Sequence, residues 1–165
     1  MSITVRQVTL DDAEGITLVL NPIVTEGKYT ILDTTFTPEE EKEFIANFPE
    51  RGVFSVAVSE DGQVLGFQNV EPFADYTKAF DHVGIIATYV SSEARGKGIS
   101  KLLFAETFKI AQQKGYRKLF AYVLGDNDRA LAAYTKQGFG IIGVAKEQAK
   151  MGERYVDETL IEKML

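Results

Sequence analysis

The alternation of apolar and polar residues along this chain predicts most of its strands. Such alternation, or a short apolar run, occurs at residues 3–8, 53–59, 63–70, 118–124, 139–145 and 155–164. Residues 83–90 form a mostly apolar run without a charged side chain, which is typical of a central strand buried on both faces. Asp61 and Gly62 lie between two of these strands and predict a two-residue hairpin turn.

Apolar positions three and four residues apart, preceded by start signals, predict two helices in the first third of the chain. Thr9 and Asp12 have the spacing of a capping box, and Thr37 followed by Pro38 is typical of an N-cap and a first helical residue. The residues expected to face the core from these helices are Ile16, Val19, Leu20, Phe44, Ile45 and Phe48.

Two more helices are expected at residues 99–113 and 129–137, where Gly115 and Gly138 would end them. The first of these would bury residues from the set Leu102, Leu103, Phe104, Phe108 and Ala111. The resulting order, β-α-α-β-β-β-α-β-α-β-β, predicts an α/β fold with a mixed sheet and helices on its faces. A length of 165 residues suits one domain, residues 1–165, with a single sizeable core.

Composition excludes several classes of site. Eighteen Lys and Arg against 24 Asp and Glu leave a net charge of −6, which argues against a protein that holds nucleic acid through phosphate contacts. The absence of cysteine excludes disulfides, thiolate zinc sites and an acyl-cysteine intermediate, and a single histidine excludes a metal site built on two imidazoles. Without a signal-peptide layout or an apolar run of about 20 residues, we expect a soluble, cytoplasmic protein that does not enter membranes.

A glycine-bearing turn between a predicted strand and a predicted helix is the first candidate binding site. Arg95-Gly96-Lys97-Gly98-Ile99-Ser100 would present free backbone N–H groups and two cations to an anion at a helix N-terminus. A P-loop would need a glycine where Ser91 stands, and a dinucleotide fingerprint would need a small residue where Lys101 stands. The pattern Arg-x-x-Gly-x-Gly/Ala fits except for Ser100. A plain surface turn remains the alternative explanation.

A second constellation follows the strand predicted at 118–124. Asn127, Ala130, Tyr134, Gly138 and Phe139 have the spacing Asn-x-x-Ala-x-x-x-Tyr-x-x-x-Gly-Phe. Asn127 could cap the helix that begins here, while Ala130 and Tyr134 share one helix face. The phenol of Tyr134 could donate a proton to a leaving thiolate, although a core aromatic with a satisfied hydroxyl is the simpler interpretation of an isolated tyrosine.

Together the two segments resemble the GNAT superfamily of acyl-CoA-dependent N-acyltransferases. The resemblance extends over nearly the whole chain and implies a mixed, mostly antiparallel sheet of about seven strands, splayed between the fourth and fifth. It implies acetyl-CoA as co-substrate, no metal, and an acceptor that is a small-molecule amine, an amino acid or a peptide N-terminus. It is also compatible with a homodimer.

The resemblance also implies site residues. The coenzyme A pyrophosphate would lie on residues 95–100, the backbone of Tyr89 and Val90 would pair with the pantetheine arm, and Tyr134 would protonate the departing thiolate. The full set expected to bind the co-substrate is Tyr89, Val90, Arg95, Gly96, Lys97, Gly98, Ile99, Ser100, Asn127, Ala130 and Tyr134.

The general base is less clear, because residues 83–90 lack the carboxylate that many family members carry on the fourth strand. His82 is a candidate, since an imidazole titrates near neutral pH. Asp81 precedes it, Glu71 ends the neighbouring strand, and a chain of water molecules is another route. The residues that could wall an acceptor pocket are Tyr29, Phe36, Glu71, Phe73, Tyr76 and Asp81. The aromatic members of this set could equally be ordinary loop anchors.

Two other functions remain open at this point. A protein of the same fold could hold acyl-CoA as a sensor or regulatory module without turnover, which the missing strand carboxylate would suit and the retained Tyr134 would not. A nucleotide-binding enzyme such as a kinase is a third hypothesis, which is weakened because the sequence does not match the P-loop pattern.

Overall fold

Strand β4 (Val83–Val90) lies in the middle of a seven-stranded sheet in the computed structural model, which describes residues 2–165. The strand order is β1-β2-β3-β4-β5-β7-β6, and every neighbouring pair is antiparallel except β4 and β5. The other strands are β1 (Ile3–Gln7), β2 (Val53–Ser59), β3 (Val64–Pro72), β5 (Lys118–Leu124), β6 (Gly140–Met151) and β7 (Arg154–Met164). The α/β class and the mixed, mostly antiparallel sheet are therefore confirmed.

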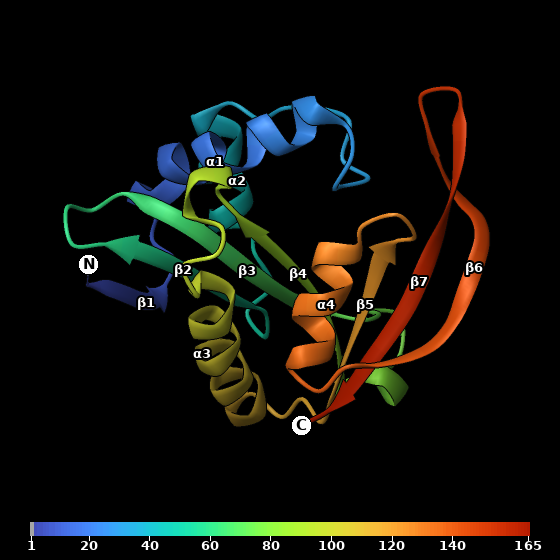
Figure 1. The fold of residues 1–165 in the computed structure, drawn as a ribbon. Helices are drawn as coiled ribbons and strands as arrows, with labels where there is room; N and C mark the ends of the chain where they lie inside the picture. Colours follow the sequence, from blue (N-terminus) through green and yellow to red (C-terminus); the bar gives the residue numbers. More distant parts are fainter. Residues whose placement is uncertain (1) are drawn as a thin grey trace.

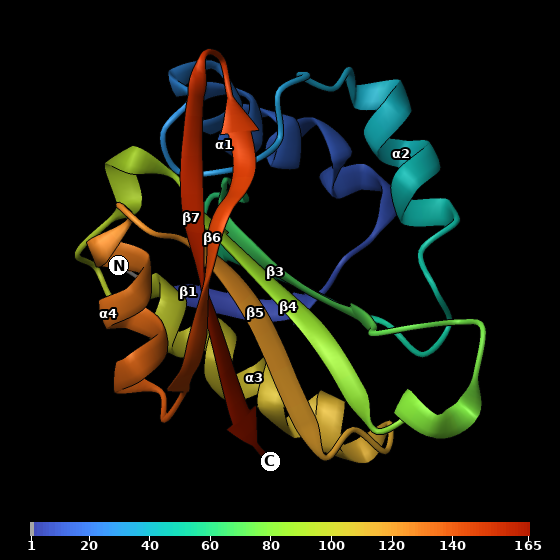
Figure 2. The ribbon, with the colours of Figure 1, turned by 90° about the vertical axis from the view of Figure 1, so that its right-hand side faces the viewer.

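Helices cover both faces of this sheet (Figures 1 and 2). The four helices are α1 (Ala13–Glu26), α2 (Pro38–Ala46), α3 (Ile99–Gln113) and α4 (Asp128–Lys136). On one face α1 buries Ile16 and Leu20 against Phe67 and its neighbours. On the opposite face α3 buries Leu103 against Leu65, and its Phe104 packs in the same cluster as residues of α4. The element order predicted from the hydrophobic pattern is confirmed.

The ends of the N-terminal helices follow from local hydrogen bonds. The amide N–H of Thr9 donates to the carboxylate of Asp12 at 2.7 Å, and a one-turn 3-10 helix leads from there into α1. At the start of α2 the amide of Glu40 donates to Oγ1 of Thr37, and the amide of Thr37 donates back to the Glu40 carboxylate. The capping box predicted at Thr9 and the N-cap predicted at Thr37 are thus confirmed, and Glu40 completes a second capping box that was not predicted.

Strands β4 and β5 part soon after they begin. They pair only from Val83 to Ile85, whereas β5 is paired with β7 along its whole length. Figure 1 shows the two strands diverging from a common lower end, with α4 above the gap. The splay explains why the prediction of a strand buried on both faces holds only for the first half of β4: from Ala87 to Val90 its residues are half-buried.

The structure corrects several details of the sequence interpretation. Three residues, 60–62, separate the paired residues Ser59 and Gln63, and Gly62 has a φ of +89°, so the turn is one residue longer than the expected two-residue loop. Phe44 is 41% exposed rather than buried, although its ring still contacts Phe48. Leu102 is also exposed.

The C-terminal hairpin is longer than predicted. Strand β6 continues to Met151, because its register with β7 shifts between Ala145 and Ala149 and pairing then resumes. In this bulge the amide of Glu147 donates to the carboxylate of Asp157 at 2.8 Å. Figure 1 shows the tip of the hairpin standing apart from α1. Among residues 2–165, no helix has the length and apolar character needed to cross a bilayer.

Candidate active site

The turn that precedes α3 has the conformation of an anion-binding loop. Gly96 and Gly98 adopt φ angles of +78° and +79°, in the left-handed region that side-chain-bearing residues avoid. In the described chain no side chain caps α3, so its first amide N–H groups point outward without a protein acceptor. Ile99 is buried and anchors this end of the helix on the sheet. The helix can approach closely because Gly66 lies opposite: a Cβ there would stand 3.3 Å from Cγ2 of Ile99.

A pocket of about 690 Å³ opens between this turn, the second half of β4 and α4. Ten of the residues predicted to bind the co-substrate line it, namely Tyr89, Val90, Arg95, Gly96, Gly98, Ile99, Ser100, Asn127, Ala130 and Tyr134. Lys97 is not among the described residues that line it.

The charged side chains that line this pocket are all cationic. Its charged lining residues are Arg95, Lys101, Arg129 and Lys136, and within residues 2–165 no carboxylate lines it. The sequence analysis missed the last three of these cations. A signal was available for two of them, because Arg129 and Lys136 are seven residues apart and lie on the same face of α4. In a chain of net charge −6, this cationic pocket is suited to a polyanion.

Tyr134 lies at the inner wall of the pocket. Its ring packs edge-on against Phe104 and Phe139, with centroid distances of 5.3 and 5.1 Å. Its hydroxyl lies 2.8 Å from Oγ1 of Thr88 on β4. Burial raises the pKa of the Tyr134 phenol well above its ordinary value, so the group stays protonated and can act as a proton donor.

Two residues behind Tyr134 were not identified from the sequence. Gln68 on β3 is fully buried, and its Nε2 donates to Oγ1 of Thr88 at 2.9 Å. Because Thr88 accepts this bond, its own hydroxyl hydrogen can go to the oxygen of Tyr134, which leaves the phenolic hydrogen of Tyr134 for another acceptor. Gln68 and Thr88 occupy paired positions of β3 and β4, and such pairing can be known only once the register is known.

A second cavity, of about 200 Å³, lies on the other side of Tyr134. It lies where β4 and β5 diverge, and β7 contributes to its wall. Six residues line both cavities, namely Tyr29, Thr88, Tyr89, Asn127, Ala130 and Tyr134. Asn127 also caps the N-terminus of α4, since its Oδ1 accepts a hydrogen bond of 3.1 Å from the amide N–H of Ala130. The two cavities are therefore adjacent, and Tyr134 belongs to the wall of both.

The loop that follows α1 contributes Tyr29 to the walls of both cavities and Thr30 to the wall of the smaller one. The guanidinium of Arg95 lies over the ring of Tyr29, 5.3 Å from its centroid. The next residue, Thr30, has its Oγ1 3.4 Å from the hydroxyl of Tyr89. The structure thus places Tyr29, expected at the acceptor site, in the walls of both cavities.

The other residues expected at the acceptor site or as base lie elsewhere. His82 is exposed at the opposite end of β4 from Thr88, six residues or about 20 Å along an extended strand. Glu71 pairs with Ile85 and, with Phe36, lines a separate pocket beside α2. The structure therefore does not bring His82 or Glu71 to Tyr134.

The segment at residues 73–81 lies at that same distant end of the sheet. Phe73 packs against Phe80 and Phe120, with centroid distances of 5.3 and 6.0 Å, so its ring anchors the loop. Tyr76 is 80% exposed, and the carbonyl of Asp81 accepts a hydrogen bond from Arg51. The sequence predicts these residues at the acceptor pocket because they adjoin β4. Proximity in the sequence does not say which end of the strand carries the site, and the structure places them at the end opposite Thr88.

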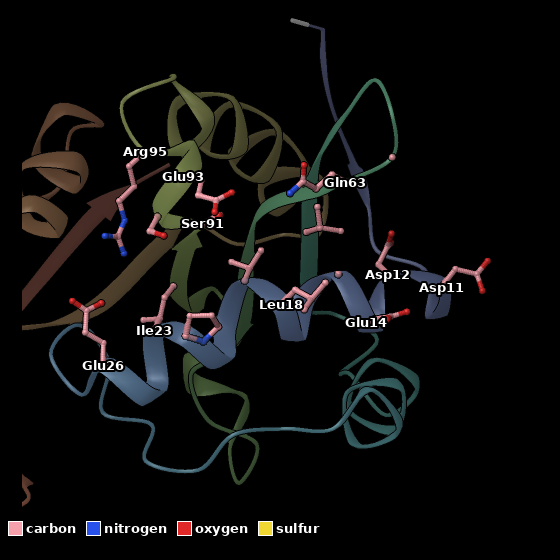
Figure 3. Close-up of a pocket in the computed structure, with 16 residues that line it drawn as sticks. Asp11, Asp12, Glu14, Leu18, Ile23, Glu26, Gln63, Ser91, Glu93 and Arg95 are labelled. Atoms are coloured by element: carbon pink, nitrogen blue, oxygen red, sulfur yellow. The ribbon is translucent and has the colours of Figure 1, made fainter.

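A further pocket, of about 410 Å³, runs along the outer face of α1 (Figure 3). Figure 3 shows Arg95 and Glu26 at one end and Asp11 and Asp12 at the other. Its carboxylates are Asp11, Asp12, Glu14, Glu26 and Glu93. Asp12 is already held by Arg6 through two hydrogen bonds of 2.8 Å. This acidic surface would repel phosphates, in contrast to the cationic pocket beside α3.

Comparison with known proteins agrees with this geometry. The sequence profile described as the acetyltransferase (GNAT) family matches residues 25–139. A phosphinothricin N-acetyltransferase of Streptomyces coelicolor is 26% identical over 166 residues, which cover 99% of this chain and 96% of that protein.

Two solved structures share the fold over nearly the whole chain. A phosphinothricin acetyltransferase of Sinorhizobium meliloti in complex with acetyl-CoA matches with a TM-score of 0.91 and 26% identity, covering 100% of this chain and 89% of that one. A ribosomal-protein-alanine N-acetyltransferase of Brucella melitensis matches with a TM-score of 0.90 and 27% identity, covering 98% and 99%. This chain belongs to the acetyltransferase (GNAT) family.

Proposed function

We propose that this enzyme binds acetyl-CoA in the 690 Å³ pocket and transfers the acetyl group directly to a primary amine bound in the adjacent cavity. The observation that carries the proposal is the position of Tyr134, which lines both cavities and whose hydroxyl lies 2.8 Å from Oγ1 of Thr88, a residue that also lines both. A group at this boundary can contact the sulfur of a thioester on one side while an amine approaches from the other.

The pocket fits the charges of coenzyme A. The diphosphate would be bound by the outward amide groups of residues 98–100, where the left-handed glycines expose the backbone, and by Arg95. Lys101, Arg129 and Lys136 would neutralise the remaining phosphate charge. The related Sinorhizobium meliloti protein was solved with acetyl-CoA, which supports the same ligand here.

The gap between β4 and β5 would accommodate the pantetheine arm of coenzyme A, which links the phosphates to the thioester. Beyond Ile85, β4 has no strand beside it on the β5 side within the described chain. The backbone of Tyr89 and Val90 could therefore pair with the amide groups of an extended ligand, as an added strand would. This would place the thioester at the level of Thr88 and Tyr134.

The chemistry follows from the residues present. Without cysteine in the sequence, the acyl group passes directly from donor to acceptor. The free amine attacks the thioester carbonyl carbon, the C–N bond forms, the C–S bond breaks, and the thiolate takes the proton of Tyr134. One proton of the acylated nitrogen then returns to the Tyr134 phenolate, which leaves the neutral amide and the thiol of coenzyme A. Alignment of two bound substrates supplies much of the rate acceleration. His82 is too distant to exchange a proton with an amine at Tyr134.

The names of the relatives support small acceptors. Those proteins are named for phosphinothricin and for an alanine of a ribosomal protein. For this chain we propose a small-molecule amine, an amino acid or a peptide N-terminus as the acceptor class.

The test combines calorimetry with acetyl-CoA and a mass-spectrometric screen of amines, amino acids and peptides. We expect acetyl-CoA to bind and at least one amine to gain 42 mass units, the mass of an acetyl group in place of a hydrogen. Binding of acetyl-CoA without turnover of any acceptor would favour a sensor over an enzyme. Failure to bind acetyl-CoA would contradict the proposal outright.

A further inference from the structure

A buried glutamate that the sequence analysis did not single out lines the 200 Å³ cavity. Glu158 on β7 is only 6% exposed, and within residues 2–165 its carboxylate has neither an ion-pair nor a hydrogen-bond partner. Burial of an unpaired carboxylate costs several kcal/mol unless a ligand compensates it. An uncompensated group of this kind at a cavity wall therefore suggests a cationic ligand.

The backbone around Glu158 holds the side chain in place. Glu158 is paired with Leu124 on one side and with Ala145 on the other. The preceding residue, Asp157, fixes the strand through its carbonyl, which accepts the amide of Gly125 at 2.8 Å, and through its carboxylate, which accepts the amide of Glu147. Because neighbouring side chains of a strand point to opposite faces, Asp157 faces the bulge and Glu158 faces the cavity.

Glu158 is also the one charged residue among the described residues that line this cavity. The rest of the wall is aliphatic, aromatic or hydroxyl-bearing apart from the neutral amide of Asn127, with Ile31, Ile85 and Leu124 on its apolar sides. No arginine or lysine within residues 2–165 lines it, so a carboxylate on the acceptor would meet Glu158 without a compensating cation. Like charges placed together in such a site cost several kcal/mol.

We propose that Glu158 binds the ammonium group of the acceptor and takes up its proton, and that the acceptor is a small primary amine without a carboxylate beside the amino group. The inference rests on the proposed function and narrows its acceptor class. Burial also raises the pKa of the Glu158 carboxyl, which brings it closer to the range useful for a general base.

The protons balance as follows. The ammonium gives one proton to the Glu158 carboxylate, and the nitrogen lone pair attacks the thioester carbonyl carbon. The C–N bond forms, the C–S bond breaks, and the thiolate takes the proton of Tyr134. The second proton of the nitrogen returns to the Tyr134 phenolate, and the Glu158 carboxylic acid releases its proton to water. The products are the amide, the thiol of coenzyme A and one free proton.

Glu158→Gln tests the role of Glu158 as the group that binds and deprotonates the acceptor, and Glu153→Gln is the matched control. Both substitutions remove one negative charge, but Glu153 is exposed at the hairpin turn. We expect Glu158→Gln to lower kcat/KM for a good amine acceptor by about 10²-fold or more, while the dissociation constant for acetyl-CoA stays within about twofold. Its melting temperature should equal or exceed that of the wild type, because a costly buried charge is removed. Unchanged kcat/KM would overturn the role of Glu158.

Leucine and leucinamide test the acceptor class, because they differ only in the carboxylate. We expect wild-type kcat/KM for leucinamide to exceed that for leucine by at least about tenfold when each is expressed per concentration of the free amine, because the carboxamide also lowers the pKa of the amine. Equal values, or a preference for leucine, would overturn the acceptor assignment and leave the proposed function intact. Failure of the wild type to acetylate any amine would overturn both.

Discussion

The hydroxyl of Tyr134 lies 2.8 Å from Oγ1 of Thr88, although the two residues are 46 positions apart in the chain. Thr88 in turn accepts a hydrogen bond from Nε2 of Gln68, so three side chains from α4, β4 and β3 form one hydrogen-bonded series. The series ends at the boundary between the two cavities. Because Thr88 can donate its hydroxyl hydrogen to the Tyr134 oxygen, the phenolic hydrogen is available to a bound substrate.

Tyr134→Phe should separate chemistry from binding. The phenylalanine ring preserves the packing against Phe104 and Phe139, and only the proton donor is lost. We expect kcat to fall about 10²-fold while the dissociation constant for coenzyme A, measured by calorimetry, changes less than about twofold. Tyr155→Phe, on the exposed hairpin, is the control and should leave both quantities unchanged. Equal turnover in wild type and Tyr134→Phe would remove the phenol from the mechanism.

Thr88→Val should damage both stability and turnover. Valine has nearly the shape of threonine, but it leaves the buried Nε2 of Gln68 without its acceptor. The free energy of unfolding should fall by about 1–3 kcal/mol in urea denaturation. We also expect kcat to fall, because the orientation of the Tyr134 hydroxyl is no longer set. Thr88→Ser keeps the hydroxyl and should restore most of kcat, and a serine variant as slow as the valine variant would argue against this hydrogen-bonded role.

Gly98→Ala should weaken binding of acetyl-CoA. Open space surrounds the position, so the penalty comes from the φ of +79° and not from a clash. Left-handed backbone costs an alanine about 1–2 kcal/mol, and relaxation would turn the amides of the turn away from the diphosphate. We expect the dissociation constant to rise about tenfold. Gly140 also borders open space but has no positive φ, so Gly140→Ala should change the dissociation constant by less than about twofold. Similar effects of the two substitutions would contradict the strained-turn explanation.

Stability should depend on pH through Glu41. This residue of α2 is only 4% exposed, and burial raises the pKa of its carboxyl from 4.5 to about 7. Since the folded state holds the proton more tightly than the unfolded chain, the cost of burial is absent below about pH 4.5, grows with rising pH, and is complete above about pH 7.

Glu41→Gln should therefore stabilise the protein more at pH 8 than at pH 5, by about 2 kcal/mol in the free energy of unfolding. Denaturant titrations at the two pH values measure this difference. Glu43→Gln, at an exposed position on the same helix, should show less than about 0.5 kcal/mol between them. A stabilisation by Glu41→Gln that does not change with pH would contradict a raised pKa.

The sequence by itself determined the local structure of this protein and the position of the glycine turn before α3. Hydrophobic periods of two and 3.6 residues specified the strands and helices, the capping residues specified where α2 begins, and the glycines at 96 and 98 indicated a turn before α3. These features depend on interactions between residues close in the chain, so a linear pattern is enough to predict them.

Only the tertiary structure decided which distant side chains meet at the site. Thr88 and Gln68 depend on the register between β3 and β4, and Glu158 reaches the cavity because β7 lies beside β5 where β4 turns away. His82 and Tyr76 were misplaced because a strand has two ends and the sequence does not say which one carries the site. Register and splay arise from long-range pairing and packing, which leave no local pattern in the chain.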